Sequence, residues 1–156
     1  MFVFKFVLIS ISSFVLILVR IISECLTVEI SKPRSKPFLV STWYRPPQSS
    51  PDLFSTFERI TDKIAAENLE LYLMGDLNCN LLSKVVGNNY SYVLNIIHIY
   101  GLTQLITNLT RVTQHSSTLI YLCQTNSPDK ISKSGVINIG ISDPSAIIDL
   151  YLLFLP

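Results

Sequence analysis

Charged residues are scarce in this chain. Lys, Arg, Asp and Glu make up 15% of its 156 residues, and the formal net charge is +1, whereas an average soluble domain has about 25% charged residues. A surface that binds nucleic acid over a wide area carries a clear basic excess, so the composition argues against such a surface. The one local basic cluster, formed by Lys32, Arg34, Lys36 and Arg45, favours a solvated hairpin turn, with phosphate contact as the alternative.

Residues that build metal sites and disulfide frameworks are also few. The three cysteines, Cys25, Cys79 and Cys123, are odd in number and widely spaced, so they indicate neither a zinc site nor a set of disulfides. We predict that they are small buried hydrophobic residues. The two histidines, His98 and His115, have no partner at metal-ligand spacing, and we predict no chemical role for them.

Apolar residues are abundant, at 49%, and a long hydrophobic run opens the sequence. The uncharged stretch between Lys5 and Arg20 is shorter than the roughly 20 apolar residues of a transmembrane helix. Three interpretations fit residues 1–23. They form a membrane anchor or signal segment, or noncoding or shifted-frame sequence fused to the coding part, or a strand of the domain itself, because β-branched and aromatic residues dominate them.

The first half of the remaining chain predicts two strands, a helix and a third strand. Alternating apolar residues predict strands over 24–30 and 38–44, joined by a turn. Ser50, as N-cap, and Pro51, at the first helical position, predict a helix that fades near Asn68. Its apolar face contains Leu53, Phe54, Phe57, Ile60 and Ile64. Residues 69–74 then predict a short strand.

The second half predicts one more helix and several strands. The helix runs over about 89–100 and ends at Gly101, a residue suited to a left-handed C-cap. Strands are predicted over 102–106, 118–123, 135–141 and 146–155, with an exposed loop over 129–134. No linker divides the chain, so these elements predict one domain.

The most informative motif is Met74-Gly-Asp-Leu-Asn78, at the end of an apolar run. Glycine allows the backbone to turn without a Cβ clash. Asp76 accepts a proton and Asn78 holds a hydrogen bond in a fixed direction, which is the pair needed to attack a phosphodiester. The alternative is that both residues only shape a turn.

Several other phrases accompany this motif in a characteristic order. They are Glu24–Ile30, Trp43-Tyr-Arg-Pro-Pro47, Gly101–Ile106, Thr110-Arg-Val-Thr113, Ser117–Ile120 and Ile141-Ser-Asp-Pro144. Over about residues 24–150 the chain resembles the endonuclease/exonuclease/phosphatase superfamily, in particular the apurinic-type endonuclease domain of non-LTR retrotransposons. The resemblance implies an α/β fold, here a partial four-layered α/β sandwich that is one half of the two-sheet fold. It divides the chain into a signal-like, anchor-like or non-homologous segment (1–23) and a partial domain (24–156).

The resemblance also implies a site and its ligands. Asp76 and Asn78 match the pair that handles the attacking water, and Tyr44 matches a tyrosine that contacts the phosphate. Asp143 matches the aspartate of a Ser-Asp-His motif, and we predict that it is both catalytic and a metal ligand. The implied cofactor is Mg²⁺, the implied partner is DNA, and the implied location is the nucleus. A functional anchor or signal would instead direct residues 1–23 to a membrane or the secretory route.

The departures from the family pattern bear on activity. No segment corresponds to the family's first half, which supplies a metal-binding asparagine and glutamate. Pro144 stands where the family has histidine, and Tyr121 stands where it has the aspartate that orients this histidine. Loss of one donor to a developing oxyanion typically costs about 10²–10³ in rate. We therefore predict a truncated and inactive endonuclease-like domain whose ancestor was a metal-dependent phosphodiester hydrolase acting on DNA. The alternative is a membrane-anchored or secreted small protein that uses the domain as an interaction module.

Overall fold

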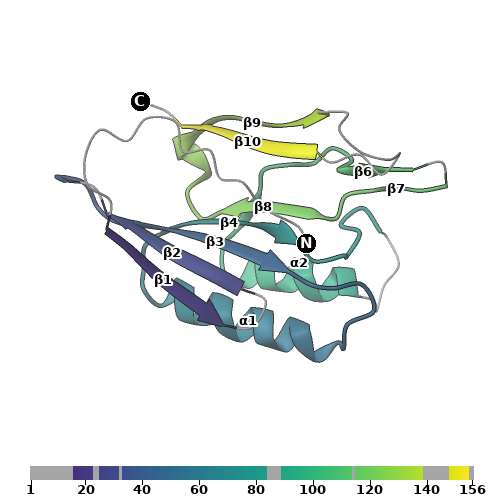
Figure 1. Cartoon of the computed structure of the whole chain (residues 1–156), viewed down its shortest axis with the longest axis horizontal. Coiled ribbons are helices and arrows are strands. Elements are labelled where there is room, and N and C mark those ends of the chain that lie inside the picture. The colour runs from purple at the N-terminus through teal and green to yellow at the C-terminus, as the bar shows by residue number, and fades with distance from the viewer. Residues whose placement is uncertain are drawn as a thin grey trace.

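The elements of the fold are known from a computed structural model, which describes residues 16–22, 25–31, 33–83, 89–113, 115–138 and 148–154. Figure 1 shows their arrangement. In chain order they are β1 (Leu16–Ile22), β2 (Cys25–Ser31), β3 (Phe38–Tyr44), α1 (Asp52–Ala65), β4 (Glu70–Asp76), α2 (Asn89–Ile99), β5 (Thr103–Gln104), β6 (Arg111–Val112), β7 (Ser117–Thr118), β8 (Tyr121–Thr125), a 3₁₀ turn (Pro128–Lys130), β9 (Ile131–Asn138) and β10 (Ile148–Phe154).

The centre of the molecule is a mixed six-stranded sheet in the order β1-β2-β3-β4-β8-β5. β2 and β3 form the predicted antiparallel hairpin, whereas β3 and β4 are parallel. Parallel neighbours need a crossover connection, and α1 supplies it. β8 then adds to β4 in the antiparallel direction. The carboxyl ends of β3 and β4 consequently lie side by side at one edge of the sheet.

Both helices cover one face of this sheet, and the β9–β10 hairpin lies on the other side of β8 (Figure 1). The predicted apolar face of α1 is buried at Phe54, Phe57, Ile60 and Ile64. Phe57 meets Trp43 of β3 edge to face, with ring centroids 5.0 Å apart. This contact joins the helix layer to the sheet next to the carboxyl end of β3.

The helix ends follow the sequence with one small difference. Pro51, rather than Ser50, is the N-cap of α1, and the Ser50 hydroxyl instead accepts a hydrogen bond from the amide of Asp52 at 3.3 Å. The prediction for the end of the second helix is confirmed. Gly101 adopts φ +61°, and the amide of Leu102 donates to the carbonyl of Ile97 at 2.8 Å.

Two strand predictions and one loop prediction in the second half need correction. The predicted strand over 118–123 is divided between β7 and β8, because the chain changes partner from β6 to β4 between them. Of the predicted strand over 102–106 only Thr103–Gln104 pair. The predicted loop over 129–134 is wrong from residue 131 onward, since pairing with β10 makes this polar stretch part of β9.

The hydrophobic N-terminal segment contributes a strand. Residues 16–22 form β1, which pairs with β2 in antiparallel register along its whole length. This strand corresponds to the third interpretation of the segment for these residues. The domain division at residue 24 stays a prediction. Among the described residues, no helix is long and apolar enough to cross a membrane.

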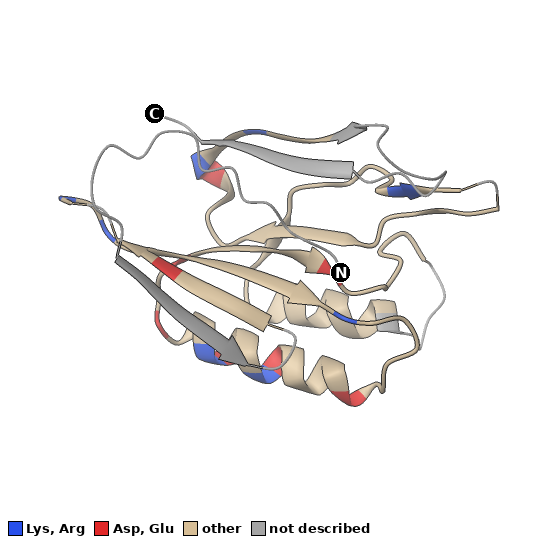
Figure 2. Ribbon diagram, in the orientation of Figure 1, with Lys and Arg blue, Asp and Glu red and all other residues tan. Residues whose placement is uncertain are grey.

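The charged residues lie mainly on α1 and at strand ends, while α2 has none (Figure 2). The predicted basic cluster does not form as one group. Arg34 lies in the exposed turn between β2 and β3, whereas Arg45 is buried. The seven residues of β3 separate them, and each residue of a strand adds about 3.3 Å. Arg34 and Arg45 are close in sequence but lie near opposite ends of β3, so they are far apart in space.

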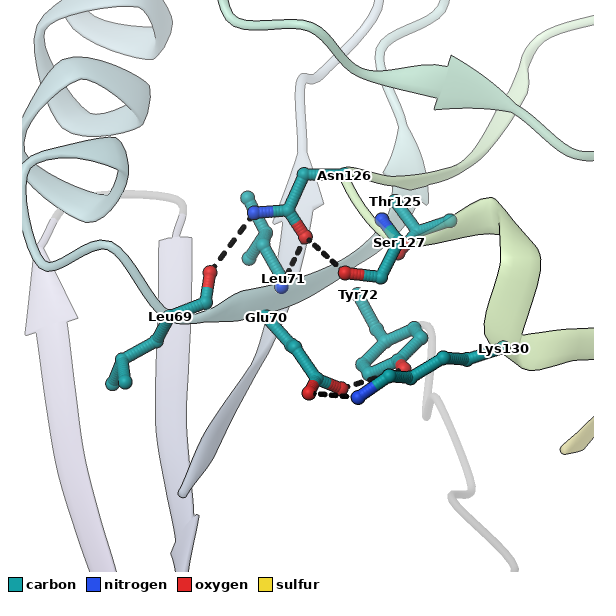
Figure 3. A network of polar contacts seen from close by, with 8 residues as sticks. All are labelled: Leu69, Glu70, Leu71, Tyr72, Thr125, Asn126, Ser127 and Lys130. Carbon is teal, nitrogen blue, oxygen red and sulfur yellow. Dashed lines mark hydrogen bonds and ion pairs between the residues drawn. The ribbon is translucent and has the colours of Figure 1, made fainter. Parts of the chain in front are cut away.

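A polar network fixes the start of β4 against the end of β8 (Figure 3). The side-chain oxygen of Asn126 accepts from the amide of Leu71 at 2.9 Å, and its amide nitrogen donates to the carbonyl of Leu69 at 2.9 Å. Nearby, Glu70 forms an ion pair with Lys130. Asn126 thus takes the place of a paired strand residue beyond the last residue of β8, and it holds β4 at the end opposite to the Gly-Asp-x-Asn motif.

Candidate functional site

Three side chains line up across the sheet where β3 and β4 end. Tyr44 is the register partner of Asp76 in the parallel pair, and Asp76 is the partner of Tyr121 in the antiparallel pair. Directly paired residues project to the same face of a sheet, and neighbouring strands lie about 4.7–4.9 Å apart. In this Tyr44–Asp76–Tyr121 row, the two tyrosines therefore project from the strands on either side of Asp76. Tyr44 and Asp76 were predicted for the site, and the register brings them together.

Gly75 makes this close approach of β3 and β4 possible. A Cβ at this position would lie 2.0 Å from the carbonyl oxygen of Trp43 and 2.8 Å from its backbone carbon and nitrogen. Gly75 lies inside β4, so the motif needs glycine for the contact between two backbones rather than for the turn that we predicted. The glycine thereby sets the separation between Tyr44 and Asp76.

Hydrogen bonds lock the loop that follows β4. The carboxylate of Asp76 accepts from the amide of Asn78 at 2.7 Å, and Asn78 adopts φ 47°, a conformation that asparagine tolerates. The side-chain amide of Asn78 donates to the carbonyl of Arg45 at 2.7 Å, and the amide of Arg45 donates to the carbonyl of Asp76 at 2.8 Å. Asn78 therefore lies beside Asp76, and its NH₂ group holds the loop after β3.

Arg45 supports the site from inside the protein and does not face a ligand. It is 5% exposed, and its guanidinium donates to the carbonyls of Ser49 at 2.8 Å and Leu77 at 3.3 Å. The guanidinium carbon also lies 4.7 Å from the ring centroid of Phe54. These contacts tie the loops after β3 and β4 to α1. The sequence alternative that this arginine contacts phosphate does not fit its burial.

The electrostatics of the row follow from burial. Asp76 is 7% exposed, and burial raises the pKa of its carboxyl, while the amide of Asn78 and the charge of Arg111 lower it. Burial also raises the pKa of Tyr121, with a further increase from the charge of Asp76 and an opposing decrease from Arg111. Tyr121 is therefore a protonated hydrogen-bond donor at neutral pH. An ionised aspartate at this position would be an acceptor.

Asp143, the histidines and the cysteines complete the set of residues that the sequence singled out. Asp143, predicted as a catalytic residue and metal ligand, lies outside the described residues, so its assignment stays a prediction. His98 and His115 are exposed. All three cysteines are buried and free, as predicted, and burial raises the pKa of Cys79 to about 11 and that of Cys123 to about 12.

The described residues do not by themselves fit a resident Mg²⁺ ion. Mg²⁺ prefers octahedral oxygen ligands that include one or two carboxylates. Asp76 supplies a single carboxylate, one oxygen of which already accepts a hydrogen bond from Asn78. In the described part of the chain, no three His, Cys, Asp or Glu side chains gather as a possible metal site. The described residues of the site orient polar groups around Asp76.

Sequence reasoning missed the residues that support Tyr121. The hydroxyl of Thr110 accepts hydrogen bonds from the amides of Ile120 at 3.0 Å and Tyr121 at 3.3 Å. The side chain of Asn80 accepts from the amide of Leu119 at 3.2 Å. Both are acceptors for backbone amides between the end of β7 and the first residue of β8. For Thr110 the signal was its place in the Thr110-Arg-Val-Thr113 phrase, which the sequence alone did not connect to the site.

Comparison with solved structures identifies proteins of similar fold. The chain is similar to the endonuclease domain of TRAS1, a telomere-specific non-LTR retrotransposon, with a TM-score of 0.69 and 14% identity over 88% of this chain and 68% of that domain. It is also similar to a functionally unknown conserved protein from Enterococcus faecalis V583, with a TM-score of 0.53 and 15% identity over 84% of this chain and 56% of that one. No protein-family model and no curated protein matches the sequence.

At these identities the similarity establishes the fold alone. The prediction of an α/β fold is confirmed, since the mixed sheet and its helices are similar in fold to that endonuclease domain.

Proposed function

We propose that this chain is an endonuclease-like domain of a retrotransposon that contacts DNA phosphates but does not cleave DNA by itself. The observation that carries the proposal is the Tyr44–Asp76–Tyr121 row at the carboxyl ends of β3 and β4. Ligands of α/β sheets bind at the carboxyl ends of parallel strands. The fold similarity to a retrotransposon endonuclease domain supports the same assignment.

The polar groups of the row suit a phosphodiester. Asp76 is a buried hydrogen-bond acceptor, and the amide of Asn78 fixes the orientation of its carboxylate. A group that orients an attacking water needs such a fixed position. Tyr44 and Tyr121 are its register partners on the two neighbouring strands, and a phenol hydroxyl can donate to phosphate oxygens. These roles of Asp76, Asn78 and Tyr44 carry over the pattern that the resemblance implies.

Tyr121 supports the loss of cleavage. An aspartate at this position would orient the family's histidine, whereas burial and the charge of Asp76 keep the Tyr121 phenol protonated. A protonated phenol cannot stabilise a cationic imidazole as a carboxylate does. Pro144, at the histidine position, has no side-chain donor. In this proposal, the ancestor of the chain was a metal-dependent phosphodiester hydrolase that acted on DNA. Asp143 is the ligand for Mg²⁺ that the resemblance implies.

Nicking of supercoiled plasmid tests the proposal. Purified wild-type protein and Asp76→Ala are incubated with plasmid in the presence of Mg²⁺ or Mn²⁺, with an intact endonuclease domain as positive control. We expect wild type and Asp76→Ala to give the same background as buffer. Mg²⁺-dependent nicking by wild type that disappears in Asp76→Ala would overturn the claim of inactivity and assign the chain as an enzyme.

A further inference from the structure

The backbone of Arg111 is held next to the site by the residue that precedes it. Its neighbour Thr110 is fully buried, at 0% exposed. The amide of Thr110 donates to the carbonyl of Thr118 at 2.9 Å, and its hydroxyl accepts from the amides of Ile120 and Tyr121. Tyr121 in turn pairs with Asp76. The backbone of β6 therefore starts one residue away from an anchor on the Tyr44–Asp76–Tyr121 row.

The positive charge of Arg111 acts on this row. It lowers the pKa of both Asp76 and Tyr121, and no other cation of the described residues does so for either group. Arg45, the other arginine at this end of the sheet, is buried and uses its guanidinium on the carbonyls of Leu77 and Ser49. Because Arg111 also begins β6, directly after the anchored Thr110, it is the cation that the described residues place at the site.

The guanidinium of Arg111 is accessible to a ligand. Its side chain is exposed, and within the described residues it forms no ion pair with Asp76. In β7, the register partner of Arg111 is Thr118, whose hydroxyl is buried without a hydrogen-bond partner among the described residues. Arginine presents five donors in a planar fork that matches a phosphate group.

We infer that Arg111 is a phosphate-binding residue of this site, held in place by Thr110, and that it supplies the positive charge for a DNA phosphate lying against the Tyr44–Asp76–Tyr121 row. This inference rests on the proposed function, since it names the group that contacts the backbone of the same DNA. The near-zero net charge of the chain makes one such contact a large share of the binding. It also predicts that overall affinity is low.

Salt-dependent binding of DNA tests the inference. The affinity of the full chain for a short fluorescein-labelled duplex is measured by anisotropy over a series of NaCl concentrations. Each phosphate neutralised contributes about −0.9 to the slope of log K against log salt. We expect Arg111→Gln to weaken binding roughly tenfold and to reduce the slope by about one, whereas Arg111→Lys keeps the slope and loses part of the affinity.

Arg34→Gln is the matched control. Arg34 is also exposed but lies in the β2–β3 turn, so removing its charge should leave the affinity and the slope at the wild-type values. Thermal unfolding shows whether each variant is folded as wild type.

Equal slopes for wild type and Arg111→Gln, or an equal loss in Arg34→Gln, would overturn the inference and leave the proposed function standing. Absence of salt-dependent binding by wild type would overturn both, whereas plasmid nicking by wild type would affect only the proposed inactivity.

Discussion

Replacing Gly75 by alanine should separate β3 from β4 where the site forms. The added Cβ would meet the carbonyl oxygen of Trp43 at 2.0 Å, whereas heavy atoms of carbon type pack at about 3.5–4.0 Å. The strands must therefore move apart by about 1.5 Å. Neither atom belongs to a flexible side chain that can turn away. The displacement falls on the backbone at the ends of both strands.

The magnitude follows from the bonds that this displacement stretches. The bond from the amide of Arg45 to the carbonyl of Asp76, 2.8 Å long, and that from the side chain of Asn78 to the carbonyl of Arg45, 2.7 Å long, would both exceed hydrogen-bonding distance. Each contributes about 0.5–1.5 kcal/mol, and overpacking adds about 1–3 kcal/mol. We expect Gly75→Ala to lower the free energy of unfolding by about 2–6 kcal/mol, a large part of the 5–15 kcal/mol typical of a domain.

Urea unfolding followed by tryptophan fluorescence is the assay, because the one tryptophan of the sequence, Trp43, is buried beside Gly75. Gly101→Ala is the matched control. Gly101 has φ +61° and open space around its added Cβ, so its substitution should cost only the left-handed strain of about 1–2 kcal/mol. A Gly75→Ala protein as stable as Gly101→Ala, with an unchanged m-value, would refute the reasoning that glycine is needed for close strand approach.

Three further predictions concern stability and activity. Asp76→Asn should stabilise the protein at pH 7 by roughly 0.5–2 kcal/mol. The raised pKa of Asp76 means that its contribution is most favourable below the unfolded pKa of about 3.9 and is lost as the pH rises through the folded pKa. Urea unfolding near pH 3 should show no such gain, and an equal gain at both pH values would contradict this origin. Asn126→Ala should lower the free energy of unfolding by about 1–3 kcal/mol because it removes the partners of Leu69 and Leu71. Ser127→Ala, which removes an exposed bond to Asn126, should lower it by less than about 0.5 kcal/mol. Similar urea midpoints for the two variants would contradict the stabilising role of the Asn126 network. The double variant Tyr121→Asp with Pro144→His should remain inactive in the nicking assay unless an intact first half is fused ahead of residue 24. The reason is that the effects of groups acting as a unit on the rate are non-additive. Robust cleavage by the double variant alone would show that the chain already holds its metal.

The sequence by itself determined the local elements whose pattern is strong. The alternation in residues 24–30 and 38–44 gave β2 and β3, the apolar spacing from Phe54 to Ile64 gave α1, and Gly101 gave the end of α2. It also pointed to Gly75 and Asp76 as a strand end. These features depend on side-chain periodicity and on the conformational freedom of glycine, which are properties of neighbours along the chain.

Only the tertiary structure decided which residues meet. The parallel register of β3 with β4 brings Tyr44 to Asp76, and the antiparallel register of β8 adds Tyr121. The seven residues of β3 separate Arg34 from Arg45. Pairing with β10 makes the polar residues after 130 part of strand β9. Pairing between distant strands fixes these contacts, and its register depends on burial of the whole sheet. The Tyr44–Asp76–Tyr121 row, and the roles that we propose for it and for Arg111, therefore depend on contacts that no local pattern contains.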